Sequence, residues 1–91
     1  MRDKILLKVL LPANRQTYEF WVPMSLRVRQ GAWLISRILG AQERARYCAS
    51  DDCDLMYAEG VSAGRLLARE DIFGSLAADD RIVDGSLLVL M

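Results

Sequence analysis

Apolar and polar positions alternate at the start of the chain in the way expected of two neighbouring strands. In residues 5–11 every second side chain is apolar on one face, which comprises Ile5, Leu7, Val9 and Leu11. Residues 17–22 are rich in aromatic and β-branched side chains, and their apolar face comprises Tyr18, Phe20 and Val22. Residues 12–16 supply turn chemistry, and Pro23 ends the second run because it lacks a backbone donor. The pattern predicts a β-hairpin.

The apolar spacing changes to a helical period after Ser25, a residue type that often caps helices. One stripe of the helical wheel is apolar: Val28, Gly31, Ala32, Leu34, Ile35, Ile38 and Leu39. The opposite side comprises Arg29, Gln30, Ser36 and Arg37. Arg27 falls at the edge of the stripe, so we expect the helix to begin nearer Val28 than Leu26. Gly40 is the expected end.

The remaining chain alternates between turns and short apolar runs. Residues 41–52 read as a polar connection, residues 55–58 as a third strand, and residues 65–67 as a short further strand. Residues 68–81 are mixed, and their expected core contacts are Ile72, Phe73 and Leu76. Residues 86–91 read as a final strand that is continuously apolar after Ser86, which predicts burial on both faces and a central place in the sheet, beside the first strand.

Together these elements predict an α+β fold in which one main helix packs on a mixed sheet of four to five strands. With 91 residues, the chain is long enough for one domain and too short for two, so we expect a single domain over residues 1–91.

The C-terminal third carries a more specific motif. A Gly-Arg-x-Leu segment at residues 64–67 is followed by Leu76 and by a closing run from Arg81 to Leu90, in which Asp84-Gly85 makes a tight turn. This motif resembles the YukD/EsaB family of bacterial ubiquitin-like proteins, and equally the ubiquitin-like cytosolic domain of EccD-type membrane subunits. Residues 41–52 depart from it, because a compact ubiquitin needs a shorter and less charged connection.

The resemblance implies a ubiquitin-like β-grasp fold and a non-catalytic, protein-binding role, accessory or regulatory, in bacterial type VII (WXG100/ESX-like) secretion. Secretion subunits are then the expected protein partners. One alternative is a ubiquitin-like adaptor unrelated to secretion. Another is a sulfur carrier or conjugated modifier, which needs a C-terminal Gly-Gly tail. The sequence ends Val89-Leu90-Met91 within the last strand, so we do not expect this chemistry.

Composition argues against several function classes. Twelve basic and twelve acidic residues balance, which gives no reason to expect a nucleic-acid partner. The chain contains no histidine, the commonest general base and metal ligand, so we expect neither an enzyme nor a bound cofactor or metal. No apolar run approaches the roughly 20 residues that span a bilayer, and no signal peptide is recognisable, so we expect no direct membrane insertion and a cytoplasmic location.

The cysteines and aspartates also favour simple interpretations. Cys48 and Cys53 have the first spacing of a plant-type ferredoxin site, but the chain has no further cysteine. We expect reduced thiols, with a local redox disulfide as the alternative. Two acidic clusters comprise Asp51, Asp52, Asp54 and Asp79, Asp80, Asp84. Their spacing does not fit a calcium loop, so we expect solvated loop charges.

Four residues are candidates for a protein-binding surface: Trp33, Arg29, Arg37 and Trp21. On the helical wheel Trp33 lies among the arginines and away from the apolar stripe, and tryptophan and arginine dominate interface hot spots. The alternatives are that residues 41–52 fold back over Trp33, or that the arginines form an ordinary solvated face. Trp21 lies on the outer side of its strand and raises the same question. The apolar end at Met91 leaves self-association open.

Overall fold

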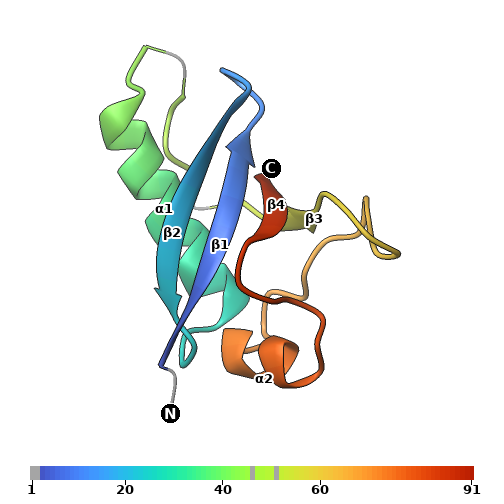
Figure 1. Ribbon diagram of the computed structural model, residues 1–91. Helices are drawn as coiled ribbons and strands as arrows, with labels where there is room; N and C mark the ends of the chain where they lie inside the picture. Colours follow the sequence, from blue (N-terminus) through green and yellow to red (C-terminus); the bar gives the residue numbers. More distant parts are fainter. Residues whose placement is uncertain (1–2, 46, 51) are drawn as a thin grey trace.

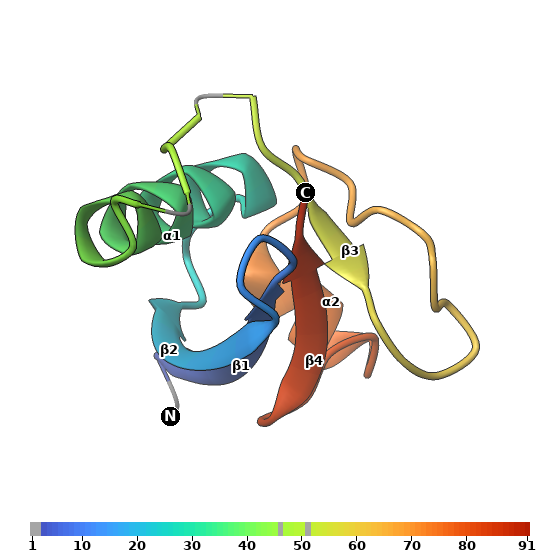
Figure 2. The same cartoon turned by 90° about the horizontal axis from the view of Figure 1, so that it is seen from above.

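The computed structural model describes residues 3–45, 47–50 and 52–91, in which a twisted sheet carries one long helix on one face (Figure 1, Figure 2). The elements in chain order are β1 (Lys4–Leu11), β2 (Gln16–Pro23), α1 (Val28–Gln42), β3 (Leu55–Tyr57), α2 (Phe73–Ala78) and β4 (Ser86–Leu90). The strand order is β2-β1-β4-β3, with β1 parallel to β4 and the other neighbours antiparallel. This is the predicted α+β arrangement, and the first and last strands lie side by side at its centre.

The pleat of β1 separates the two faces of the sheet. Ile5, Leu7 and Val9 are buried toward α1, and Val22 and Leu88 on the neighbouring strands join them in the core. The predicted apolar face of the hairpin is therefore confirmed. The alternate residues of β1 and β2 lie on the opposite face, where Leu6 stands across from Trp21 and Lys8 across from Glu19.

Two expectations about the ends of α1 are wrong. The N-cap residue is Arg27 rather than Ser25, and Gln30 provides the cap by accepting the Arg27 backbone N–H at 2.9 Å. The helix also continues past Gly40 to Gln42. Gly40 has a packing role instead, because a Cβ there would lie 2.9 Å from the Cβ of Ala49 in the connection that follows.

The buried stripe of α1 is narrower on one side than the wheel predicts. Leu34 and Ile38, expected in the core, are 42% and 44% exposed, whereas Ser36, expected on the polar face, is fully buried. The Ser36 hydroxyl shares a 2.6 Å hydrogen bond with the Tyr47 hydroxyl and accepts the Ser50 backbone N–H at 3.0 Å. The residues after α1 therefore fold back over the Ser36 side of the helix, which a polar side chain on that side makes possible.

Between β3 and β4 the chain differs from prediction in two ways. Residues 65–67 form an isolated bridge between Leu66 and Met56 rather than a strand, so within the described residues the sheet has four strands, the lower of the two predicted numbers. The mixed segment contains the short helix α2, whose first residue, Phe73, is completely buried against Gly31 of α1. Phe73 and Leu76 are core residues as expected, and Ile72 is half-buried.

Candidate protein-binding surface

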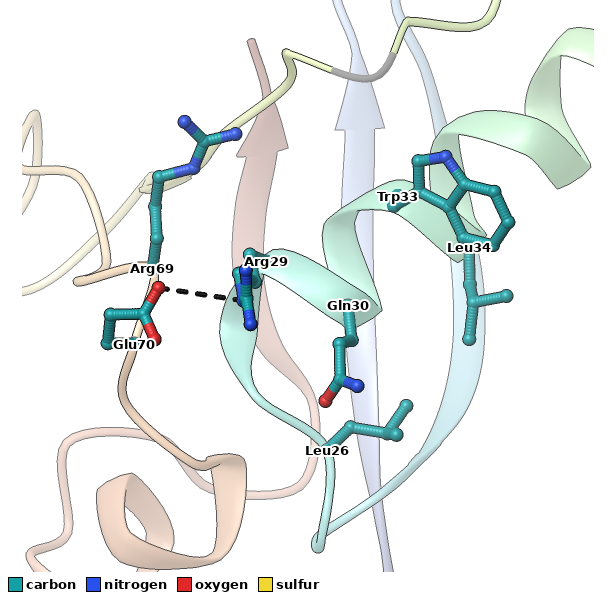
Figure 3. A pocket seen from close by; sticks show the side chains of 7 residues that line it. All are labelled: Leu26, Arg29, Gln30, Trp33, Leu34, Arg69 and Glu70. Carbon is teal, nitrogen blue, oxygen red and sulfur yellow. Dashed lines mark ion pairs between the residues drawn. The ribbon is translucent and has the colours of Figure 1, made fainter.

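An open groove of about 630 Å³ runs along the first turns of α1 (Figure 3). It is lined by Leu26, Arg29, Gln30, Trp33, Leu34, Arg69 and Glu70. One wall is the surface of α1, and the other is the segment that leads into α2. Charged groups lie at one end of the groove and the apolar side chains of Trp33 and Leu34 at the other (Figure 3).

Backbone hydrogen bonds hold the two walls together. The first N–H groups of a helix have no partner within it. Here the Val28 N–H donates to the Asp71 carbonyl at 2.8 Å, and the Arg29 N–H donates to the Arg69 carbonyl at 3.0 Å. Arg27 forms an isolated bridge with Ile72. The segment before α2 is therefore fixed against the start of α1, and the shape of the groove follows from the fold.

The charged end of the groove is organised around Glu70. Its carboxylate lies 3.5 Å from Nε of Arg29 and 3.9 Å from Nη1 of Arg27, and the same Nη1 donates to the Glu70 carbonyl at 2.7 Å. Arg69 extends away from this cluster, as Figure 3 shows, and pairs with Asp52 and Asp54. Exposed ion pairs of this kind contribute at most about 1 kcal/mol each, so they orient side chains more than they stabilise the fold.

The apolar end is formed by Trp33, whose surface is 39% exposed. The Arg37 guanidinium lies 5.1 Å from the centre of the indole ring, within the range of a cation–π interaction. Trp33 and Arg37 are one helical turn apart, so the stacking is local to α1. Because the stacked guanidinium already restricts the indole, a partner that covers Trp33 should remove little further conformational entropy.

Three of the four predicted binding residues thus lie together at the groove, and the side chain of the fourth lies elsewhere. Trp33 and Arg29 line the groove and Arg37 stacks on Trp33, whereas Trp21 is 61% exposed on the sheet face away from α1. The described residues of the connection after α1 contact the Ser36 side of the helix, and Trp33 retains a partly exposed surface. The lining residues that the sequence did not single out are Leu26, Gln30, Leu34, Arg69 and Glu70.

The remaining chemical candidates occupy ordinary environments. Cys48 is exposed, Cys53 is buried, and both are free thiols. Burial raises the pKa of the Cys53 thiol, although its hydrogen bond with Ser36 acts in the opposite direction. Asp84 accepts the Leu6 backbone N–H at 3.0 Å, while Asp51 lies outside the described residues. Over the described ranges, no three potential ligands gather in a way that would hold a metal ion.

Comparisons with known proteins show the fold. No protein-family model and no curated protein sequence matches the chain. Among solved structures, it is similar to the ubiquitin-like domain of the Mycobacterium tuberculosis type VII secretion protein EccD1, with a TM-score of 0.68 and 13% identity over 99% of both chains. It is also similar to ubiquitin from Caldiarchaeum subterraneum, with a TM-score of 0.59 and 19% identity over 96% of this chain and 90% of that one. The fold is a ubiquitin-like β-grasp.

A third similarity concerns a larger assembly. A chain of the ESX-5 inner membrane complex matches 99% of this chain with a TM-score of 0.76 and 11% identity, and the match covers 21% of that longer chain. The β-grasp fold thus recurs there as one part of a larger polypeptide. In the described part of the present chain, no helix has the length and apolar character needed to cross a membrane.

Proposed function

We propose that this chain is a non-catalytic protein-binding module that acts as an accessory or regulatory component of a bacterial type VII secretion system. The observation that carries the binding role is the exposed Trp33, stacked by Arg37 and placed beside an open groove with apolar and charged ends. Well-packed tryptophan and arginine side chains contribute a large share of binding energy at many interfaces.

The secretion context is supported by structural similarity to EccD1 and to the ESX-5 chain, which are components of such systems. It is also supported by the C-terminal motif from Gly64 to Leu90, which resembles the YukD/EsaB family. A ubiquitin-like fold alone serves many functions, so the partner must be identified by experiment.

The test is site-specific photo-crosslinking in the organism that produces the chain. A photoreactive amino acid replaces Leu34, which lines the groove and is 42% exposed, and a matched chain carries it at the fully exposed Val61. We expect the Leu34 position alone to crosslink a secretion subunit, such as a membrane ATPase of the FtsK/SpoIIIE type. Crosslinks only to proteins outside secretion would reject the secretion role and favour the adaptor alternative.

A pair of tryptophan variants tests the surface itself. Trp33→Ala is expected to weaken binding of the crosslinked partner by at least about tenfold, the effect of a typical hot-spot residue. Trp21→Ala removes an equally large exposed side chain outside the groove and should weaken binding less than Trp33→Ala does, whereas Val61→Ala, at a fully exposed turn, should leave the affinity nearly unchanged. If the folded Trp33→Ala chain binds the partner as tightly as the wild type does, the groove beside Trp33 is not the binding surface. A loss confined to Trp21→Ala would place the partner on the other face of the sheet.

A further inference from the structure

The outer edge of β2 offers unpaired backbone positions beside an apolar cleft. β2 is the end strand in the order β2-β1-β4-β3, so within the described residues no strand lies on its outer side. In an antiparallel pair, residues alternate between bonding toward the partner strand and pointing away from it. Which residues of β2 point outward can be derived from the bonds of β1.

Leu6 of β1 bonds on the side of β4, since the Gly85 N–H donates to its carbonyl at 2.9 Å and its own N–H donates to Asp84. Its alternate neighbours in β1 therefore bond toward β2, and so do their register partners in β2. The register Leu6↔Trp21 then leaves the backbone groups of Trp21, and by alternation those of Glu19 and Thr17, directed outward.

A small cleft lies between this edge and α1. It encloses about 90 Å³ and is lined by Phe20, Trp21, Val22, Pro23, Leu26, Gly31, Leu34, Ile35 and Ile38. Leu34 and Ile38 are the two large aliphatic side chains that α1 leaves exposed. The cleft is smaller than an apolar cavity of about 150 Å³ that holds a benzene molecule, so it takes one small aliphatic side chain, and Leu34 and Ile38 at its edge can contact others. It adjoins the Trp33 groove, because Leu26 and Leu34 line both.

The charge of the helical wall indicates what the occupant carries. α1 contains Arg29 and Arg37 and no acidic residue. Arg29 pairs with Glu70, whereas among the described residues no carboxylate pairs with Arg37, which directly precedes Ile38. The acidic residue of β2 is Glu19, which lies on the other face of the sheet across from Lys8. An acidic side chain near Arg37 is therefore complementary to this wall.

We infer that the partner supplies an extended segment that adds to the sheet as a strand alongside β2. Its backbone pairs with the outward groups of Thr17, Glu19 and Trp21, its alternate apolar side chains enter the cleft or contact Leu34 and Ile38 at the cleft edge, and an acidic residue meets Arg37. A second copy of this chain fits less well, because a two-fold pairing centred on Glu19 sets two carboxylates opposite each other. The inference rests on the proposed binding role and is independent of the secretion context.

The probe is a displayed library of random twelve-residue peptides selected on the intact chain. We expect enriched peptides in which apolar residues alternate and an acidic residue flanks them. With an enriched peptide bound, amide hydrogen exchange should slow at least tenfold at Thr17, Glu19 and Trp21. The amides of Tyr18 and Phe20, already bonded to β1, should change little.

A pair of aspartate variants tests the cleft. Ile38→Asp is expected to weaken the enriched peptide at least tenfold, while Val61→Asp, at a fully exposed turn, should not. Three results would overturn the inference. The enriched peptides could have apolar residues at helical spacing, or no peptide could be enriched. Alternatively, the bound peptide could slow amide exchange in β2 without the alternate pattern. Slow exchange at Glu19 in the concentrated protein alone would also overturn it and would identify a second copy as the occupant. If Leu34 crosslinks persist in the Ile38→Asp chain, the binding role stands and only the added strand fails.

Discussion

At Gly31 in α1, an added methyl group would have two opposite effects on stability. It would favour the helix, and it would overlap with a buried side chain that packs against this position. Replacing a helical glycine by alanine usually stabilises a protein by roughly 0.5–1 kcal/mol, because alanine restricts the unfolded chain and favours the helix. In α1, however, a Cβ on residue 31 would lie 2.5 Å from Cε2 and 2.7 Å from Cζ of Phe73. Ordinary carbon–carbon contacts are about 3.5–4.0 Å, so the overlap is roughly 1 Å.

The ring of Phe73 cannot relieve this overlap at low cost. Phe73 is 0% exposed and packs in the main core, so its displacement disturbs other buried side chains. Overpacking of a core costs about 1–3 kcal/mol. Because two ring atoms are overlapped by about 1 Å, the cost should lie above about 2 kcal/mol, and with the gain of roughly 0.5–1 kcal/mol from helix propensity subtracted, Gly31→Ala should lower the free energy of unfolding by about 1–2 kcal/mol. For a domain of this size that corresponds to a fall in Tm of roughly 5–15 °C.

Urea unfolding followed by far-UV circular dichroism measures this change directly, and a double-mutant cycle isolates its cause. In a Phe73→Leu background the clash is removed, so adding Gly31→Ala should be neutral or stabilising. The coupling between the two sites should then be about 1–3 kcal/mol. Two results would refute the packing argument: Gly31→Ala stabilises the wild-type chain, or the coupling between the two sites is near zero. Either result would mean that the Phe73 ring does not lie as close to residue 31 as the structure shows.

Three further predictions follow from buried polar and titratable groups. Ser36→Ala should lower the free energy of unfolding by about 1–2 kcal/mol in urea, because the Tyr47 hydroxyl and a backbone N–H lose their partner; an unchanged midpoint would contradict this. A thiol reagent at neutral pH should modify Cys48 quickly and Cys53 only upon unfolding, since burial protects Cys53 and raises its pKa; equal rates would show Cys53 to be accessible. Burial also raises the pKa of Tyr57, which favours the neutral phenol in the folded state, so the stability it supports is lost above about pH 10. In the Tyr57→Phe variant the free energy of unfolding should fall less steeply above that pH, and identical pH profiles of the two chains would exclude ionisation of Tyr57 as a cause.

The sheet was predictable because its signals are local. Alternation in residues 5–11 identifies the buried face of β1, and the continuous apolar run in residues 86–91 indicates a strand with neighbours on both sides. Residues 65–67 were less predictable. Their backbone bonds to β3, as the Tyr57 N–H to the Arg65 carbonyl at 2.8 Å shows, but the pairing does not extend beyond a single bridge.

The face of α1 was predicted only in part, because a helical wheel does not specify what packs on either side of the stripe. The connection after α1 covers the Ser36 side and satisfies that hydroxyl. The opposite side lies over the edge strand β2, where the sheet ends, and so Leu34 and Ile38 remain exposed. Both outcomes depend on contacts between segments distant in sequence.

The proposed binding surface shows the same division between local and distant signals. Trp33 and Arg37 are one turn apart, so their proximity follows from helical spacing alone. The second wall of the groove, with Glu70, reaches α1 only because the Val28 and Arg29 N–H groups bond to residues before α2. No periodicity in the sequence connects these segments.

Folding and binding should therefore be separable within a single helix. Gly31 and Ser36 are buried. The missing side chain of Gly31 lets Phe73 approach α1, and the hydroxyl of Ser36 binds the connection that follows the helix. Trp33 and Ile38 are substantially exposed, and substitutions at exposed positions away from special features usually change stability by no more than about 0.5 kcal/mol. Leaving large apolar side chains in water gains nothing for the fold, and the proposed partner would cover those on this side of α1. Variants at Ser36, which lines neither the groove nor the cleft, should then lose stability while the surviving folded protein binds normally, and variants at Ile38 should lose binding while unfolding at the wild-type urea concentration.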